Sequence, residues 1–254
     1  MVFSWAWHHY PTVSSTMDVA RELLCQEEGF NAVAVMADQQ TSGRGRRGRQ
    51  WISGQGNLFL TLGFRPKCQT EVIPQISLVA AAALHCDLKS LGRSPSDFTL
   101  KWPNDVLLKG RKVAGLLLES DHSDALTVLL GVGVNINHSP NETTFPATSL
   151  ESEVSAPPKP RPLAESFVTV FETQYDRWVR YGFDETRNYW RQNASFLGQK
   201  IGVCLAQGEA PVEGEFLDIE ADGALKLKEY NGNEHCYYAG EITSMRPEIT
   251  PAYL

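Results

Sequence analysis

The sequence lacks several features that would place it in a specialised class of protein. It has no apolar run approaching the ~18 residues of a membrane-spanning helix, so we expect no membrane partner. Its beginning, MVFSWAWHHYPT, has no basic stretch followed by an apolar one, as a secretory signal would. It contains neither a G-x-x-x-x-G-K-[ST] loop nor a G-x-G-x-x-G that opens a helix. These absences argue against a P-loop and a Rossmann dinucleotide site.

Paired cysteines are also lacking. The five cysteines are odd in number and form no Cys-x-x-Cys pair, which disfavours a disulfide framework or a zinc site. We therefore expect free thiols and a cytoplasmic location. His8 and His9 are adjacent, but no acidic or cysteine partner stands at ligand spacing, so the sequence assigns no metal ligands.

A basic excess, typical of nucleic-acid-binding domains, is missing too. Lysine and arginine number 23 against 30 acidic residues, for a net charge of −7. Yet the segment TSGRGRRGRQW, residues 41–51, holds four arginines and three glycines between Gly43 and Arg49. Glycine-rich backbone and guanidinium groups together bind phosphate or carboxylate. The segment predicts an ordered anion-binding loop, and single-stranded RNA is an alternative ligand that the acidic chain disfavours.

The hydrophobic pattern predicts an α+β fold with a mixed sheet flanked by helices. Residues 105–119 predict a hairpin that turns at Lys109-Gly110. After Phe196 the sequence pattern predicts short strands joined by turns. We expect one large domain over residues 1–195 and a small β domain over 196–254. The expected strands are 31–37, 57–64, 98–102 and 126–134, and the expected helices are 17–25, 74–91, 162–181 and 184–194.

Two further segments carry polar groups at the ends of strands. KWPNDVLLKGRKVAGLLLE, residues 101–119, places Asn104 and Asp105 after a short strand and Lys112 just beyond the hairpin turn. A lysine beside an Asn-Asp pair and across from an arginine loop is a candidate for a phosphate contact, and Gly115 lets a ligand approach the backbone. GVGVNIN, residues 131–137, ends an apolar strand with two asparagines.

In this order and spacing, GRGRRGR, KWPNDVLL, KVAGLLLE and GVGVNIN resemble the motifs of the biotin protein ligases. SSTMDVAREL, residues 14–23, resembles the start of that family's first helix. GEFLDIEADGALKL and AGEITSMR, residues 214–227 and 239–246, resemble its C-terminal SH3-like β-barrel. The resemblance covers nearly the whole chain. It implies a catalytic domain like those of class II aminoacyl-tRNA synthetases and lipoate ligases.

The resemblance also implies the reaction. Biotin and ATP, with Mg²⁺, would form biotinyl-5′-adenylate, which would acylate one lysine of a biotin carboxyl carrier domain of acetyl-CoA carboxylase. The biotin carboxylate and ATP are both anions, and two unit charges about 4 Å apart repel by ~1 kcal/mol in water and ~4 kcal/mol at an effective dielectric of 20. Fixed cations would remove that repulsion, with Lys112 bridging the carboxylate and the α-phosphate.

Site residues follow from the match to the family's motifs. Those expected to be catalytic are Lys112, Arg44 and Arg46. Those expected to bind biotin are Ser15, Thr16, Met17, Gln40, Gly43, Arg44, Gly45, Arg46, Lys112, Gly115 and Leu116. Those expected to bind ATP or the adenylate are Arg46, Arg49, Trp51, Asn104, Asp105, Lys112 and Asn135. Met17 departs from the family, in which asparagine is common.

Alternatives and partners complete the sequence-based expectations. A lipoate or octanoate transfer enzyme on the same scaffold is the nearest rival, disfavoured by GRGRRGR and KWPND. The Ser-Thr motif begins at residue 14, and the thirteen residues before it are too few for a helix-turn-helix domain, so we expect no nucleic-acid partner. A homodimer with sheets side by side is an expectation from the resemblance.

Overall fold

The computed structural model describes residues 3–26, 32–52, 54–92, 94, 96–121, 125–141, 143, 145–206 and 209–245. Its larger part is a seven-stranded sheet in the order β1-β2-β3-β7-β6-β5-β4. β1 runs parallel to β2, and the other neighbours are antiparallel, so the expected mixed sheet is confirmed. The strands are β1 (Ala6–Val13), β2 (Ala32–Gln40), β3 (Leu58–Phe64), β4 (Phe98–Lys101), β5 (Asp105–Leu108), β6 (Arg111–Asp121) and β7 (Thr127–Val134).

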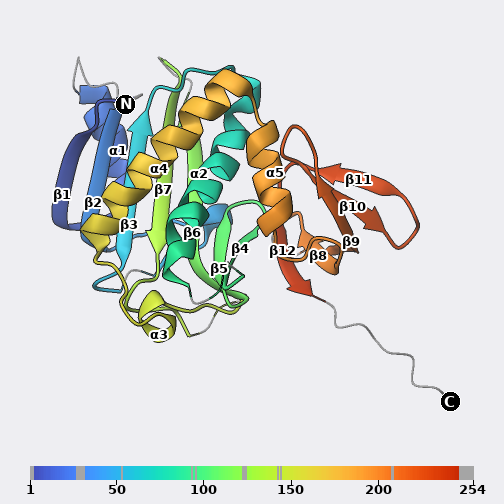
Figure 1. Cartoon of the computed structure of the whole chain (residues 1–254). Coiled ribbons are helices and arrows are strands. Elements are labelled where there is room, and N and C mark those ends of the chain that lie inside the picture. Colours follow the sequence, from blue (N-terminus) through green and yellow to red (C-terminus); the bar gives the residue numbers. More distant parts are fainter. Residues whose placement is uncertain are drawn as a thin grey trace.

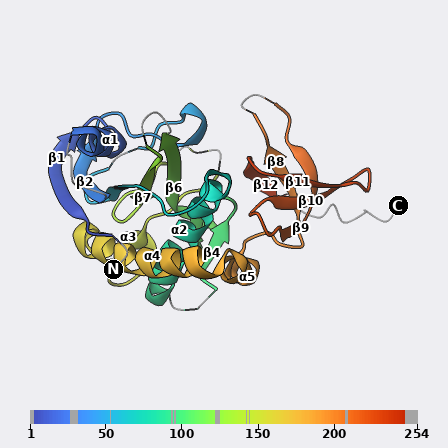
Figure 2. The same cartoon turned by 90° about the horizontal axis from the view of Figure 1, so that it is seen from above.

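Helices cover the two faces of this sheet unequally (Figures 1 and 2). On one face lie α2 (Ile73–Leu88), α4 (Pro160–Tyr181) and α5 (Asp184–Asn193), and on the other lies α1 (Thr16–Gln26). Two apolar clusters result, a large one that includes α2 and α4 and a small one beneath α1. α1 contacts β2, β3 and β7, so the neighbouring part of that face, over β6, is left for a cavity.

α2 is the most apolar helix of the fold. With the short 3-10 turns at its two ends, Thr70–Val72 and Lys89–Leu91, it is long and apolar enough, by length and composition alone, to cross a membrane. Core helices pass the same test, and most of this helix is buried. Its alanines, Ala80–Ala83, are buried against the main core, which brings α4 close.

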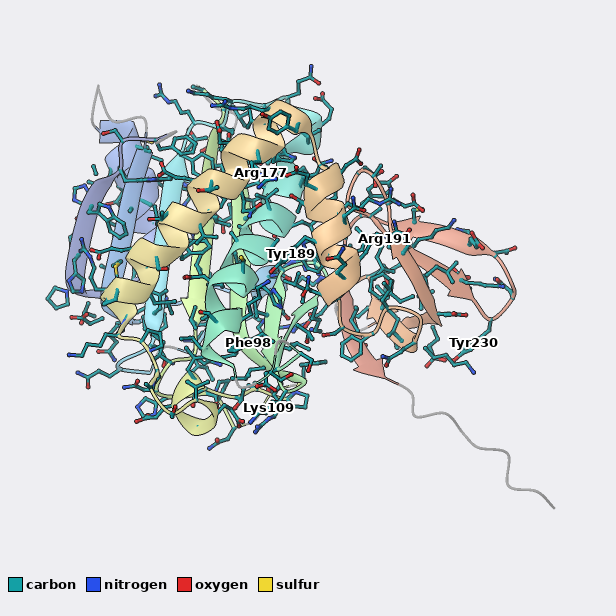
Figure 3. All side chains as sticks on the ribbon, viewed as in Figure 1. Phe98, Lys109, Arg177, Tyr189, Arg191 and Tyr230 are labelled. Carbon is teal, nitrogen blue, oxygen red and sulfur yellow. The ribbon has the colours of Figure 1, made fainter. Side chains whose placement is uncertain are left out.

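The C-terminal part is a five-stranded antiparallel sheet, in agreement with the expected small β domain. Its order is β11-β10-β9-β8-β12, and its strands are β8 (Lys200–Cys204), β9 (Val212–Ile219), β10 (Leu225–Glu229), β11 (Glu234–Tyr237) and β12 (Glu241–Met245). It packs beside α5, where Arg191 contacts Asp218 of β9 at 2.9 Å (Figure 3). The indole of Trp102 also donates to Gly223 O at 3.0 Å.

The structure corrects the sequence-based elements in three places. β1 was not expected, because its residues are half-exposed at an edge and show no clear alternation. α4 begins at Pro160, since proline is tolerated in the first turn of a helix, and the connection before it contains the short helix α3 (Leu150–Glu153). The arginine segment, expected as an ordered loop, contains a 3-10 turn at Arg46–Gly48 and an Arg44–Gln50 bridge. Asn31, the start of an expected strand, and residues 246–254 of the expected C-terminal domain lie outside the described residues.

Candidate functional site

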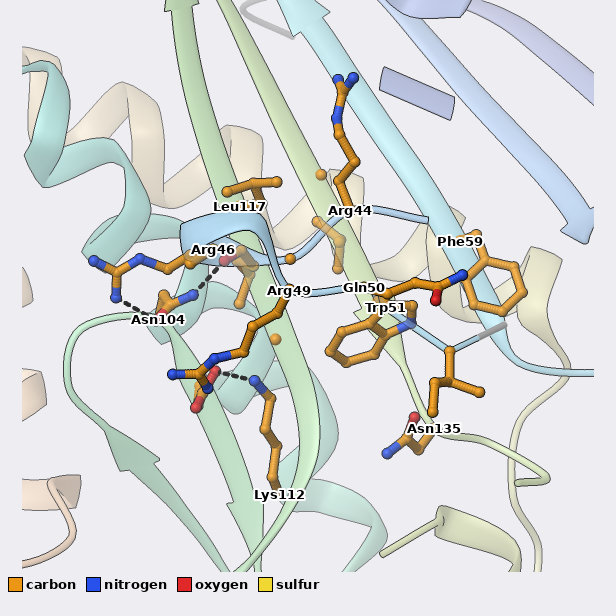
Figure 4. Close-up of a pocket in the computed structure, with 18 of the residues that line it drawn as sticks. Arg44, Arg46, Arg49, Gln50, Trp51, Phe59, Asn104, Lys112, Leu117 and Asn135 are labelled. Atoms are coloured by element: carbon orange, nitrogen blue, oxygen red, sulfur yellow. Dashed lines mark hydrogen bonds and ion pairs between the residues drawn. The ribbon is translucent and has the colours of Figure 1, made fainter. Parts of the chain in front are cut away.

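A cavity of about 310 Å³ lies beside α1, within the size range of small-molecule sites. It brings together the N-terminus of α1, the end of β2, the arginine segment, the β5–β6 hairpin and the end of β7 (Figure 4). Glu241 of β12 also lines it, so the C-terminal sheet contributes to the same site. Residues from at least five separate parts of the sequence therefore meet at one cavity.

The floor of the cavity is built from glycines on neighbouring strands. Gly115 of β6 pairs with Gly133 of β7, and on the cavity side both are covered by the indole of Trp51. A Cβ atom on Gly133 would lie 2.5–2.8 Å from three indole atoms, and one on Gly115 would lie 3.0 Å from the ring. Only glycine at these two positions leaves room for a flat group against the sheet.

One end of the cavity is uncharged and polar. Ser15 precedes α1 and its Oγ accepts from Met17 N at 3.3 Å, which is the role of an N-cap residue. The backbone N–H and the hydroxyl of Thr16 both donate to Gln40 Oε1, at 2.9 and 3.1 Å. Ser15 and Thr16 are buried, and the walls around them are apolar. Such an end suits a neutral head group that carries both donors and acceptors.

The other end is cationic. Lys112 Nζ lies 2.6 Å from Asp105 Oδ1, and the fully buried Lys101 Nζ lies 3.1 Å from Asp105 Oδ2. Burial raises the pKa of the Asp105 carboxyl, but attraction to Lys112 and Lys101 outweighs it and holds that pKa below its usual value. Asp105 is therefore an ionised anchor that fixes the ammonium of Lys112 at the cavity wall.

The arginines of the 41–51 segment are all paired within the protein. Arg49 forms a two-pronged ion pair with Glu241, which also lies 3.7 Å from Lys101 Nζ. Arg46 donates to Asn104 Oδ1 at 3.2 Å and to Gly240 O at 3.0 Å. Burial lowers the pKa of the Arg46 guanidinium, and the negative charge of Asp105 opposes this effect.

The remaining two arginines face away from this end of the cavity. Arg47, at φ 58°, donates to Cys204 O and Leu205 O at 2.9 and 2.8 Å. Arg44 pairs with Asp18 at 2.5 Å and with Glu119 at 3.4 Å, and in Figure 4 its guanidinium points away from Lys112. Carboxylates and carbonyls from distant parts of the chain therefore offset the like-charge repulsion within the segment.

All but one of the expected site residues line this cavity. The exception is Gly43, whose carbonyl accepts from Trp51 N at 2.9 Å and which lines a second, more open depression along the arginine segment. Met17 lines the cavity and is buried in the small cluster beneath α1, so it provides apolar wall where the family commonly has asparagine. The roles assigned to the lining residues stay predictions.

Sequence reasoning missed several lining residues. Ile52 is 58% exposed at the cavity rim, and Phe145 lies with its ring 4.2 Å from Lys101 Nζ. Glu241 belongs to the AGEI stretch of the C-terminal motif, which could have suggested it, whereas nothing local marks Phe145. The further lining residues that were not expected are Gln50, Phe59, Leu60, Leu117, Gly131, Val132, Gly133, Pro140, Thr143 and Ala147.

The cavity offers no ready-made metal cage. Among the described residues, no group of three histidine, cysteine or acidic side chains is arranged to hold a metal ion. Its two carboxylates, Asp105 and Glu241, are both engaged by cations. These residues do not fit a resident Mg²⁺ ion, and the adjacent histidines do not change this, because His9 pairs with Asp38 at 2.7 Å on the far edge strand.

Comparisons with known proteins match this chain to two family models and to a similar ligase. The model of the biotin/lipoate A/B protein ligase family matches residues 10–136, and that of the biotin protein ligase C-terminal domain matches residues 196–243. A biotin–[acetyl-CoA-carboxylase] ligase of Paracoccus denitrificans is 38% identical over 206 residues, covering 76% of this chain and 83% of that protein.

Two solved structures are similar over nearly the whole chain. The biotin protein ligase of Aquifex aeolicus, in complex with biotin and ATP, has a TM-score of 0.78 and 25% identity, covering 96% of this chain and 98% of that one. The biotin protein ligase of Leishmania major, in complex with biotinyl-5-AMP, has a TM-score of 0.67 and 28% identity, covering 92% and 98%.

Proposed function

The chain belongs to the biotin protein ligase family, and from this we propose that it joins biotin to a lysine of a biotin carboxyl carrier domain at the expense of ATP. One observation carries the proposal. A single cavity has a neutral polar end at Thr16 and Gln40 and a cationic end at Lys112, Arg46 and Arg49. A long molecule with a neutral cyclic head and a carboxylate tail, followed by a nucleotide, matches that order of surfaces.

The chemistry has two steps. A carboxylate oxygen of biotin attacks the α-phosphorus of ATP, the bond to the bridging oxygen breaks, and pyrophosphate leaves. The neutral amine of the acceptor lysine then attacks the carbonyl carbon of the mixed anhydride, AMP leaves with the bonding electron pair, and the attacking nitrogen releases one proton to water. Lys112, fixed by Asp105, neutralises charge where the carboxylate meets the α-phosphate, the point at which two anions approach each other.

The remaining cations act on the nucleotide side. Arg46 and Arg49 are held by Asn104 and Glu241, and incoming phosphates would exchange for these partners. Trp51 lies over the glycine floor, beside Lys112, and provides an apolar surface at the junction of the two substrates. Mg²⁺ enters as part of the MgATP substrate complex, because the cavity's own carboxylates are engaged by cations.

The cellular setting is part of the same proposal. All five cysteines are free, which fits a reducing cytoplasm. The acceptor would be the carrier domain of an acetyl-CoA carboxylase, the substrate that the Paracoccus relative's name gives for that enzyme. The homodimer stays a prediction.

The test is incorporation of biotin into an isolated carrier domain. The protein is incubated with the carrier, biotin, ATP and Mg²⁺, and the product is identified by the mass of the modified lysine peptide. A carrier with that lysine replaced by arginine is the control. Parallel reactions with octanoate and lipoate address the rival activity. Transfer of octanoate or lipoate without transfer of biotin would overturn the proposal.

A further inference from the structure

Thr61 is a polar residue in the middle of an otherwise apolar strand. It belongs to β3, whose seven residues, LFLTLGF, are all buried, and its own exposed fraction is 0%. It lies between Val35 of β2 and Gly131 of β7, on the face that α1 covers. It does not line the cavity, but its Oγ1 lies 2.8 Å from the Oγ1 of Thr16, which does.

The direction of the hydrogen bonds at this point can be derived from the backbone. The N–H of Thr16 can only donate, so the Gln40 side-chain atom 2.9 Å away must be the carboxamide oxygen. That oxygen can only accept, so the hydroxyl of Thr16, 3.1 Å away, must point its proton at it. Thr16 has no second proton, and Thr61 must therefore donate to Thr16.

The result is a chain with one direction, from Thr61 to Thr16 to Gln40. It fixes the amide of Gln40 so that its oxygen faces Thr16 and its NH₂ group points the other way. It also fixes the rotation of the Thr16 hydroxyl, since one lone pair accepts from Thr61 while the proton is committed to Gln40. Without the Thr61 hydroxyl, the buried Thr16 oxygen would lose its hydrogen-bond donor.

We propose that Thr61 is a positioning residue for head-group selection, which holds Thr16 and Gln40 in the arrangement that recognises a cyclic urea rather than an aliphatic chain. The inference rests on the proposed function, since it takes biotin as the ligand. A urea head offers N–H donors and a carbonyl acceptor, and discrimination by such groups requires that the protein's partners be fixed before binding. An aliphatic acid makes no such demand, so its binding does not depend on the chain.

The test compares Thr61→Val, which keeps the shape and removes the hydroxyl, with Thr61→Ser, which restores the hydroxyl. Pyrophosphate release is measured with biotin and with desthiobiotin, which keeps the urea ring, and octanoic acid is titrated as an inhibitor of the biotin reaction. Thr186→Val, at a buried threonine on α5 remote from the cavity, is the matched control.

We expect Thr61→Val to raise KM for biotin and for desthiobiotin roughly tenfold, the loss of about one buried hydrogen bond. The kcat and the KM for ATP stay unchanged. The inhibition constant of octanoic acid, calculated with the altered KM for biotin taken into account, also stays unchanged. Thr61→Ser recovers most of the affinity, and Thr186→Val shows no change.

Three results would overturn the inference while the wild-type protein remains an active biotin ligase. They are an unchanged KM for biotin in Thr61→Val, equal losses for biotin, ATP and octanoic acid, and a failure of Thr61→Ser to recover affinity. An absence of biotin-dependent pyrophosphate release from the wild-type protein is different, because it overturns the proposed function itself.

Discussion

Lys112 and Asp105 form an ion pair across the β5–β6 hairpin, with Nζ 2.6 Å from Oδ1. The pair does not neutralise the site, because the second oxygen of Asp105 is already held by the buried Lys101. One carboxylate thus holds two ammonium groups, one inside the fold and one at the cavity. The arrangement provides a lysine that stays in place and keeps a surplus of positive charge for an anionic ligand.

Replacement of Lys112 by alanine should depress adenylation far more than it weakens folding. Asp105 keeps Lys101 as a partner, so we expect a small drop in melting temperature, whereas the rate falls at least ~100-fold, as for loss of one charge-stabilising donor. Pyrophosphate release at saturating biotin and ATP measures the effect. Lys109→Ala, at the exposed tip of the same hairpin, is the control. An unchanged rate in Lys112→Ala contradicts the assigned role.

A methyl group at Gly133 should displace the indole of Trp51. The added carbon would lie 2.5–2.8 Å from three ring atoms, and such overpacking costs ~1–3 kcal/mol. We expect Gly133→Ala to weaken binding of biotinyl-adenylate roughly tenfold or more, measured by calorimetry. In a Trp51→Leu background the same methyl should cost less, because the ring it meets is gone. Additive losses in the double variant would show that the two residues act independently.

The sequence predicts those parts of the site that depend on local pattern. The hairpin that carries Lys112 is encoded by turn residues at Lys109 and Gly110, which have φ of 50° and 74°, flanked by apolar runs. The partners of the arginines are not predictable in this way. Glu241 lies 192 residues from Arg49, and only the docking of the C-terminal sheet brings them together. Counting charges along the segment predicts that its arginines repel one another, but the folded chain places carboxylates beside them.

Two other features escaped sequence reasoning for different physical reasons. β1 lies at the sheet edge, where side chains are half-exposed on both faces and no period-2 pattern develops. Thr61 lies in a buried strand. Threonine is common in strands, so its presence there does not suggest a function. Its importance emerges only from the 2.8 Å contact with Thr16, a residue of a different element.

His85 should make the fold sensitive to mild acid. It is fully buried, donates from Nε2 to Phe98 O at 2.9 Å, and accepts at Nδ1 from the hydroxyl of Tyr189 at 2.8 Å (Tyr189 is labelled in Figure 3). Burial lowers the pKa of this imidazole, an effect that the bond to Phe98 opposes and that Lys89 adds to. The unfolded chain therefore binds a proton near pH 6.5 that the folded chain does not accept until lower pH.

The sign of the effect follows from that difference. Stability is full above about pH 6.5 and falls as the pH drops toward the folded pKa, by at most about 1.4 kcal/mol per pH unit. Urea unfolding between pH 7.5 and 5.5 measures it. The non-titrating variant His85→Gln should show a flatter dependence over this range, even if it is less stable throughout. Parallel curves for the two proteins would exclude His85 as the cause.

The arginine segment should be a switchable site of proteolysis, and Glu241 should set how readily it is cut. Trypsin cleaves after arginine, and in the unliganded protein the segment between Arg44 and Arg49 is attached to the C-terminal sheet by arginine side chains. The Arg49 side chain is 47% exposed, so its pair with Glu241 is worth no more than ~1 kcal/mol. Transient release therefore allows slow nicking in the absence of ligand.

Removal of the charge on Glu241 should accelerate that nicking. We expect Glu241→Gln to be cut after Arg49 up to about fivefold faster than the wild type, because that is the population change that ~1 kcal/mol provides. Glu234→Gln, which loses an exposed pair with Lys226 in the same sheet, is the matched control.

Biotin with ATP and Mg²⁺ should slow cleavage strongly in both wild type and Glu241→Gln, and biotin alone should slow it partly. The reason is that the ligands supply anions that replace Glu241 as the partner of the arginines and exclude water from the anhydride. Equal cleavage rates with and without ligands would show that the segment does not close over the substrates, and equal rates for Glu241→Gln and the wild type would show that the C-terminal sheet does not hold it.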